Sequence, residues 1–483
     1  MSKIGKNILY NLAYQILVLI TPLITTPYIS RVLGVEGIGT YSYVSSVEYY
    51  FFIFITLGLT NYGNRSIAKC RDDRNHRSRT FWSIYFMQVF CGILAIAAYA
   101  IYIARFSDIA YRQFFAVYLL HLASAAVDIN WFFFGLEEFK FTTVRNAIVK
   151  VATLICILAF VRGQNALLVY FIIVAGSSLV SNLLLWTRVF RHVDFLMPTF
   201  KECAAHIKPN LLLFIPIIAM SVYRVMDKIM IKQLSGIEQN GYYENADRII
   251  TISLTAFSAI ATVMMPAVSN MVAQKKDDAV KKILREMMQI VNWLSVAMVF
   301  GLMVISRRFA PLFFGSQFLE SGVLMIGLAP TIFFSGWKNV LRSQYLIPYE
   351  KDSAYVVSLI VGALCNVIAN LYFIPQLGAR GAVIGTLIAE LAGFLIQTSV
   401  AGQVVNVFEL VKDFVWFLPA GGIMAFIAIA MLKLVPDSLI GIAIVVILSA
   451  VIYAVFSTVT LWIVYRAKAE KILATIKGRL GRK

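Results

Sequence analysis

The residues of this sequence that are most suited to chemistry are charged side chains within long apolar runs. One such run, SVYRVMDKIMIK at residues 221–232, holds Arg224, Asp227 and Lys228. Residues three or four positions apart share one face of a helix, so Arg224 can reach the other two. Arginine binds phosphate through a planar fork, and lysine binds it as a point charge. The run could therefore bind an anion, or its charges could pair with each other and fix helix packing.

The composition of the chain indicates the surroundings of these charges. Of the 483 residues, 60% are hydrophobic and 14% are charged, whereas about 25% of the residues of a soluble domain are charged. This predicts an integral membrane protein. The net charge of +18 is then explained by basic connections between membrane spans rather than by nucleic-acid binding. The cysteines and histidines lack the spacing of a metal site or a disulfide framework, so we expect no metal site and no cofactor.

Apolar runs of about 20 residues can cross a hydrocarbon core of about 30 Å, and they predict fourteen transmembrane helices. The expected spans are residues 8–29, 38–60, 80–103, 113–135, 143–161, 165–187, 208–232, 242–269, 286–305, 318–337, 354–374, 381–403, 414–432 and 439–465. Loops rich in Lys and Arg stay in the cytoplasm. With both termini inside, the cytoplasmic segments hold 30 of the 43 Lys and Arg residues and the external segments hold 9. The sequence thus predicts an all-α, multi-pass membrane protein with both termini in the cytoplasm.

Cations at or within the expected spans could together form an anion site. The predicted members are Arg31, Arg224, Lys228 and Arg248. If Asp227 neutralises Arg224, Lys228 still leaves a net positive charge. Alternatively, Arg224 pairs with Asp227 and Arg248 with Asp247 to fix helix packing, while Arg31 and Lys228 reach the outer lipid headgroups.

Carboxylates within spans are costly unless they have a partner or face a polar cavity, so they are candidates for binding a proton or a sodium ion. These candidates are Glu48, Asp128, Asp227, Asp247 and Glu390. Each could instead be a hydrogen-bonding group in helix packing. The sequence contains no P-loop motif, which argues against direct use of ATP.

Two short segments indicate an internal repeat. GVEGIGTY at residues 34–41 aligns without a gap with GIEQNGYY at residues 236–243. They follow the first and the seventh expected spans, which predicts two six-helix lobes related by a pseudo-two-fold axis along the membrane normal. The predicted parts are an N-terminal lobe at 1–190, a cytoplasmic linker at 191–207, a C-terminal lobe at 208–403, and two further spans with a basic cytoplasmic tail at 404–483.

Four motifs lie in order across nearly the whole chain. They are SRVLGVEGIGTY at 30–41, NYGNRSIAKCR at 61–71, the segment from MDKIMI to GYYENADR at 226–248, and IPQLGARGA at 374–382. Together they resemble the polysaccharide transporter family of flippases. That family includes the Wzx-like O-antigen and capsule flippases and belongs to the MOP superfamily, with the lipid II flippases and the MATE exporters.

The resemblance implies a two-lobed helical bundle that works by alternating access and is not an enzyme. Its cargo would be an oligosaccharide repeat unit on undecaprenyl diphosphate, moved to the outer leaflet of the bacterial inner membrane for O-antigen, capsule or exopolysaccharide synthesis. The four cations would bind the diphosphate, and H⁺ or Na⁺ would be the coupling ion. Membrane lipids would be further partners, as would polysaccharide polymerase and chain-length proteins.

Two other functions are alternatives. A cation-coupled, MATE-like exporter shares the superfamily, but the cationic side chains argue against cationic drugs as cargo. A membrane glycan polymerase or ligase would usually carry a large external loop with catalytic residues. The expected external connections are too short for such a loop.

Overall fold

The computed structural model describes residues 3–402 and 406–480, and within these residues every regular element is helical. The first helices along the chain are α1 (Lys3–Thr56), α2 (Leu59–Lys69), α3 (Arg74–Arg105), α4 (Arg112–Ala126), α5 (Asn130–Gly135), α6 (Phe139–Phe160), α7 (Leu167–Val189), α8 (Phe200–Ala205), α9 (Ile207–Ser235) and α10 (Ile237–Ala273). They are followed by α11 (Asp277–Phe314), α12 (Leu319–Leu328), α13 (Thr331–Leu341), α14 (Asp352–Leu377), α15 (Ala379–Ala401), α16 (Val407–Leu434) and α17 (Leu439–Leu480). Short 3-10 or π turns connect some of them, namely η1 (Ile109–Tyr111), η2 (Gln164–Ala166), η3 (Ser316–Phe318) and η4 (Arg342–Leu346).

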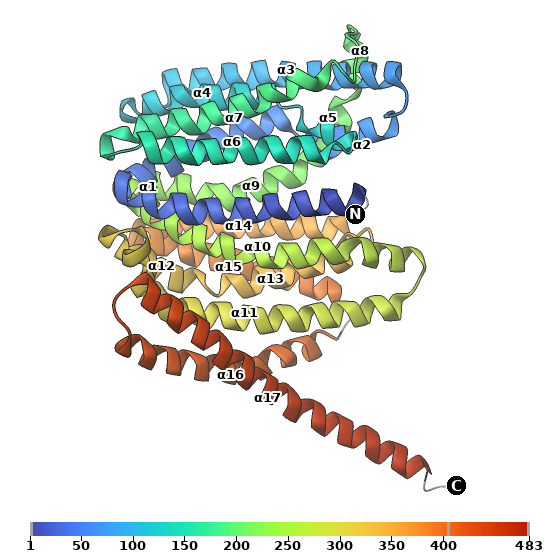
Figure 1. Ribbon diagram of the computed structural model, residues 1–483, viewed down its shortest axis with the longest axis vertical. Coiled ribbons are helices and arrows are strands. Elements are labelled where there is room, and N and C mark those ends of the chain that lie inside the picture. Colours follow the sequence, from blue (N-terminus) through green and yellow to red (C-terminus); the bar gives the residue numbers. More distant parts are fainter. Residues whose placement is uncertain (1–2, 403–405, 481–483) are drawn as a thin grey trace. The chain divides into compact units, whose positions relative to one another are not determined.

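The helices confirm an all-α, multi-pass membrane protein. Among the described residues, 11 segments are long and apolar enough to cross a membrane, and two bent helix pairs raise the number to 13. One of these segments, Ile20–Lys69, combines much of α1 with α2. The 54 residues of α1 are far too many for one crossing of a core of about 30 Å. Gly34 breaks α1 with φ 71° and ψ −176°, between the first two expected spans, and the ribbon turns there (Figure 1). Every expected span therefore has a helical counterpart, while the count of fourteen and the orientation stay predictions.

The chain forms two compact units, Met1–Asn245 and Ala246–Lys483, which divide within α10. In the first unit, α4 packs against α3 and α7, and α6 packs against α1 and α7; the ribbon shows α3, α4, α6 and α7 side by side (Figure 1). In the second unit, α11 packs against α12, α13, α16 and α17, and α14 packs along α15. The lobes and the linker predicted from the sequence remain predictions.

Aromatic side chains fill much of the core of the first unit. One cluster contains Tyr43, Tyr99, Phe115, Tyr118 and Phe171, all of which are buried. A second cluster, which contains Phe81, Trp82, Trp131 and Phe132, lies toward the end of the unit at which α3 begins. These large rings bury much apolar area and hold the helices of the unit together.

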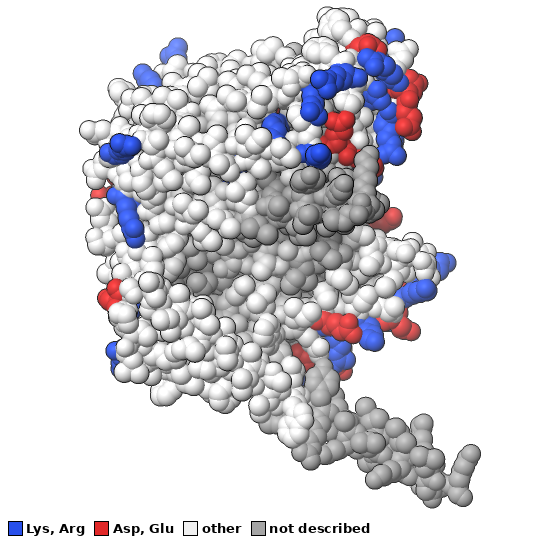
Figure 2. Space-filling model, viewed as in Figure 1, with Lys and Arg blue, Asp and Glu red and all other residues white. Residues whose placement is uncertain are grey.

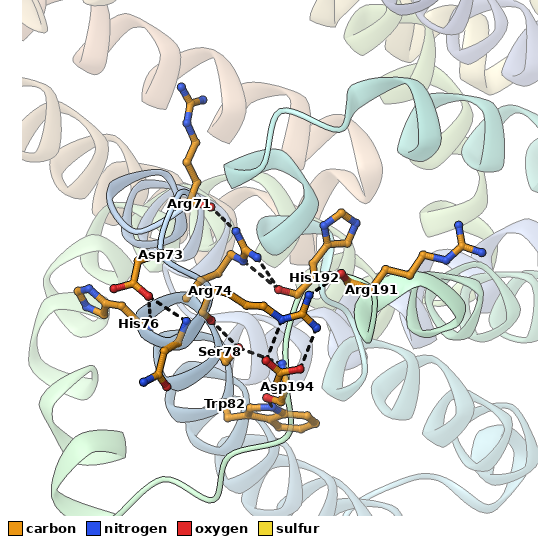
Figure 3. Close-up of polar contacts among 11 residues, drawn as sticks. Arg71, Asp73, Arg74, His76, Ser78, Trp82, Arg191, His192 and Asp194 are labelled. Atoms are coloured by element: carbon orange, nitrogen blue, oxygen red, sulfur yellow. Dashed lines mark hydrogen bonds and ion pairs between the residues drawn. The ribbon is translucent and has the colours of Figure 1, made fainter.

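Charged side chains gather at that same end of the first unit, whereas the sides of the helices in view are largely uncharged (Figure 2). The segment between α7 and α8 is tied there to the start of α3 (Figure 3). Arg74 donates from Nε and Nη2 to the two carboxylate oxygens of Asp194, both at 2.8 Å. The backbone N–H of Asp194 donates to Ser78 Oγ at 2.9 Å, and Trp82 Nε1 donates to Asp194 O at 2.9 Å. The hydrogen bonds and charge of Arg74 hold the pKa of Asp194 below its usual range.

Candidate functional site

The two turns that suggested an internal repeat pack directly against each other. A Cβ atom on Gly39 would lie 2.1 Å from the carbonyl oxygen of Ile237, and a Cβ atom on Gly241 would lie 2.2 Å from that of Val35. In the gap-free alignment of the two segments, Gly39 corresponds to Gly241 and Val35 corresponds to Ile237. The contact is therefore reciprocal, as a local two-fold relation between the two segments requires. Only glycine fits at either position.

Hydrogen bonds reinforce this contact on both sides. Asn240 Nδ2 donates to Gly39 O at 2.9 Å, and Asn245 Nδ2 donates to Ser30 Oγ at 2.9 Å. All of these polar atoms belong to buried residues, where a satisfied hydrogen bond counts for more than at the surface. Ser30 directly precedes Arg31 in α1. The seam therefore fixes the part of α1 that carries Arg31 against the start of α10.

Lys228 on α9 has a carboxylate partner that the sequence did not indicate. Its Nζ atom lies 2.7 Å from Glu244 Oε2, and the two side chains are 17% and 10% exposed. Ser42 Oγ donates to the same oxygen at 2.9 Å. Ser42 and Glu244 also correspond to each other in the repeat alignment. In this structure the charge of Lys228 is thus balanced within the first unit.

Arg224 is the other predicted cation on α9. Its side chain is exposed, and among the described residues it forms no ion pair. Asp227 is 3% exposed and accepts a hydrogen bond from the Tyr243 hydroxyl at 2.8 Å. On α9, the cation without an ion pair among the described residues is therefore Arg224. One possibility from the sequence was the opposite, namely that Asp227 neutralises Arg224 and Lys228 keeps the net positive charge.

The other two predicted cations lie in different units. Arg31 is exposed on α1 in the first unit. Arg248 lies on α10 in the second unit, where it and Asp247 are both partly buried. Arg31, Arg224 and Lys228 therefore belong to one unit, Arg31 on the part of α1 before Gly34 and the other two on α9.

Two of the predicted ion-coupling carboxylates contact a basic side chain of their own unit. Glu48 Oε1 on α1 lies 2.8 Å from His121 Nδ1 on α4, and the Glu48 side chain is 3% exposed. Glu390 Oε2 on α15 lies 2.9 Å from Lys338 Nζ on α13, and Ser335 Oγ donates to the same oxygen at 2.7 Å. Both carboxylates are thus compensated by a partner on another helix.

Asp128 has different surroundings. It follows α4 at a break in the helix, and its Oδ1 atom accepts hydrogen bonds from the backbone N–H and the side-chain amide of Asn130 at 2.8 and 2.6 Å. In the described part of the chain, no group of three or more His, Cys, Asp or Glu residues could hold a metal ion. Asp128 is therefore a single carboxylate surrounded by amides.

Sequence reasoning missed three residues at these sites. Arg145 and Lys338 are among the 30 Lys and Arg residues that the charge count assigns to cytoplasmic segments. In the structure Arg145 is 5% exposed on α6, and Lys338 is paired with Glu390. His121 has no predicted role in the sequence analysis, but it contacts Glu48. Their positions in the sequence could have indicated these roles, because each residue lies at or inside an apolar run, where a basic group needs a partner.

Residues 4–272, more than half of the chain, match the family described as "Polysaccharide biosynthesis protein". The chain belongs to the polysaccharide biosynthesis protein family. This confirms the resemblance found in the sequence motifs. Among members and relatives, the "Putative O-antigen transporter" of Escherichia coli (strain K12) is 20% identical over 395 residues, which cover 80% of this chain and 93% of that protein.

Solved structures share the fold of this family member. The structure titled "Lipid II flippase MurJ, inward closed conformation" matches with a TM-score of 0.74 and 14% identity, covering 96% of this chain and 100% of the other. An inward-facing MATE multidrug transporter of the MOP superfamily matches with a TM-score of 0.60 and 14% identity, covering 80% and 94%. Both of these solved structures carry the names of a flippase or a transporter, which agrees with the prediction that this chain is not an enzyme.

Proposed function

We propose that this member of the polysaccharide biosynthesis protein family is a flippase for lipid-linked glycans. The name of the E. coli relative and the fold shared with a lipid II flippase support this function. The cargo is an oligosaccharide repeat unit on undecaprenyl diphosphate, which moves by alternating access from the cytoplasmic to the outer leaflet of the bacterial inner membrane. A diphosphate and sugar hydroxyls need such a protein, because each unsatisfied polar group costs several kcal/mol in hydrocarbon.

The observation that carries this proposal is Arg224, an exposed cation near the end of an apolar helix with no ion pair among the described residues. A charge at this depth is stable only beside water, headgroups or a charged ligand. Arg224, with Arg31 on the adjacent helix, binds the diphosphate. Lys228 can join them when it leaves Glu244. Arg248 stays the fourth cation predicted from the sequence. The same positive charges disfavour cationic drugs as cargo.

The coupling ion in this proposal is a proton, held by Glu48 and His121. A carboxylate and an imidazole in contact can share a proton, and the imidazole can donate or accept it. Glu390 is less suited, because Lys338 already provides a permanent positive partner at 2.9 Å. Asp227 and Asp247 remain predicted candidates for the same role.

The test is transport by the purified protein in liposomes that contain undecaprenyl-diphosphate-linked repeat units. We expect Arg224→Ala to lower the initial rate at least tenfold, because a charge-assisted hydrogen bond to phosphate contributes about 1.5–3 kcal/mol. Arg162→Ala is the matched control, since Arg162 is an exposed arginine in the connection between α6 and η2. Equal rates for the wild type and both variants would show that Arg224 does not bind the cargo.

A further inference from the structure

The first unit contains a membrane helix that is broken at one point and repaired by side chains. α4 ends at Ala126 and α5 begins at Asn130, and both lie within one candidate span, Ile109–Gly135. Gln88 Nε2 donates to the carbonyl oxygens of Ala125 and Asp128 at 2.8 and 2.9 Å. Irregular backbone at membrane depth is tolerated only where protein groups or a water-filled cavity satisfy it.

Further donors satisfy two other carbonyl groups at this break. Trp186 Nε1 donates to Val127 O at 2.9 Å, and Asn182 Nδ2 donates to Ser124 O at 3.0 Å. Four amide or indole N–H groups are therefore used to keep one short stretch of backbone non-helical. Broken helices in transporters often mark the place where a ligand binds.

A cavity of about 260 Å³ lies beside the break. Its polar lining residues are Thr56, Thr60, Gln88, Asp128, Asn130 and Asn146, and its apolar lining includes Trp131 and Phe134. Pockets for drug-sized ligands span about 300–1,000 Å³. The cavity therefore has room for one small ring, but not for a whole oligosaccharide or a prenyl chain.

The hydrogen bonds at this cavity determine which polar atoms a ligand would meet. Buried Arg145 donates from Nη2 to the Oδ1 atoms of both Asn130 and Asn146, so both amide oxygens are occupied. Asn146 Nδ2 forms no hydrogen bond with the described residues. Asp128 Oδ2 likewise forms none, because the bonds from Asn130 go to Oδ1. The cavity offers a carboxylate acceptor and an amide donor.

This pair of groups selects a class of ligand. A cation needs several oxygen ligands, but Arg145 occupies the two asparagine oxygens and adds a positive charge. An anion would be repelled by Asp128. A neutral ring with neighbouring hydroxyl groups fits both groups, because one hydroxyl donates to Asp128 and the next accepts from Asn146.

We propose that this cavity binds one sugar ring of the cargo, with Asp128 and Asn146 as direct ligands and Arg145 as the residue that positions the amides. The inference rests on the proposed flippase function, and it gives Asp128 the role of a sugar ligand in place of an ion-coupling one. The cavity lies at the end of the second expected span and the start of the fifth, which is the cytoplasmic side in the predicted orientation. Cargo would therefore meet it when it is loaded.

The test compares the binding of two lipids to the purified full-length protein. One probe is undecaprenyl diphosphate, and the other is the same lipid carrying the complete repeat unit of the host. We expect Asp128→Asn and Asn146→Ala each to weaken binding of the sugar-bearing lipid about tenfold, the effect of one lost hydrogen bond to a ligand. Both variants should bind the sugar-free lipid as the wild type does, and the exposed residue Asn165 provides the control variant Asn165→Ala.

Three results would overturn the sugar site. Equal weakening for both lipids would assign the residues to a general structural role. Unchanged binding of both lipids would show that the cavity does not contact cargo, and an altered Na⁺ or pH dependence with unchanged sugar discrimination would make Asp128 an ion site. In each of these cases the flippase function is not contradicted, provided that the wild-type protein binds the lipids. A wild type that binds neither lipid contradicts the flippase function, and the sugar site with it.

Discussion

Alanine at Gly39 tests the reciprocal contact between the two repeated turns. The new Cβ atom would lie 2.1 Å from Ile237 O, whereas ordinary contacts begin at 3.4 Å. The turns must therefore move apart by about 1 Å, and overpacking of this kind costs about 1–3 kcal/mol. Loss of the hydrogen bond from Asn240 to Gly39 O adds about 0.5–1.5 kcal/mol. We expect a total of about 2–4 kcal/mol, which lowers the melting temperature of a chain of this length by roughly 2–4 °C.

The assay is thermal unfolding of the detergent-purified protein, followed by the amount that stays monodisperse after heating. Gly241→Ala should have an effect of similar size, because its Cβ would lie 2.2 Å from Val35 O. The double variant should cost less than the two single variants together, since one separation of the turns relieves both clashes. Gly176→Ala is the control, because no atom lies within 4 Å of its Cβ position. A melting temperature for Gly39→Ala that equals that of Gly176→Ala would refute the reciprocal contact.

Three further predictions concern single charged groups. Lys338→Ala should destabilise the protein by about 3–5 kcal/mol in thermal unfolding, because it leaves Glu390 buried without its cation. The double variant with Glu390→Gln should regain most of this stability. A double variant that is less stable than Lys338→Ala by the cost of Glu390→Gln alone would contradict the pairing. Asp194 has a lowered pKa in the folded protein, so its contact with α3 is fully present above about pH 4 and is lost as the pH falls through the lowered value. In the wild type, hydrogen exchange at the Asp194 amide should become faster at that acidic pH. In Asp194→Asn the exchange at residue 194 should be fast at every pH. The control variant Asp72→Asn, in which the replaced side chain is 98% exposed, should behave as the wild type does. Glu48→Gln should abolish the dependence of transport on a proton gradient while exchange of cargo without a gradient persists, and a retained dependence would assign coupling to another group.

The helices could be predicted from the sequence because they follow from local patterns, and the same holds for the match between the segments 34–41 and 236–243, whereas the two six-helix lobes stay a prediction. A run of apolar residues predicts a span whatever its neighbours are, so every expected span has a helix in the structure. The match between residues 34–41 and residues 236–243 has a physical reason, which is the glycine that both segments contain at the same position. Gly39 and Gly241 are the positions at which each segment allows the backbone of the other to approach.

The pairing of charges could not be predicted, because it depends on contacts between distant helices. Glu244 lies 16 positions after Lys228, beyond the reach of any rule for residues on one helix. Arg145 was counted with the loop cations because a charge count along the chain cannot detect burial. The cavity beside Asp128 depends on a break after α4 that no Gly or Pro announces.

Transport by the protein alone is the most direct test of the flippase assignment. Liposomes that contain only this protein and an undecaprenyl-diphosphate-linked repeat unit would be compared with protein-free liposomes, and the sugars that become accessible at the opposite leaflet would be measured over time. We expect sugars to appear within minutes with the wild type and at least tenfold more slowly with Arg224→Ala. A wild-type rate equal to that of protein-free liposomes, with folded protein present, would contradict the proposed function.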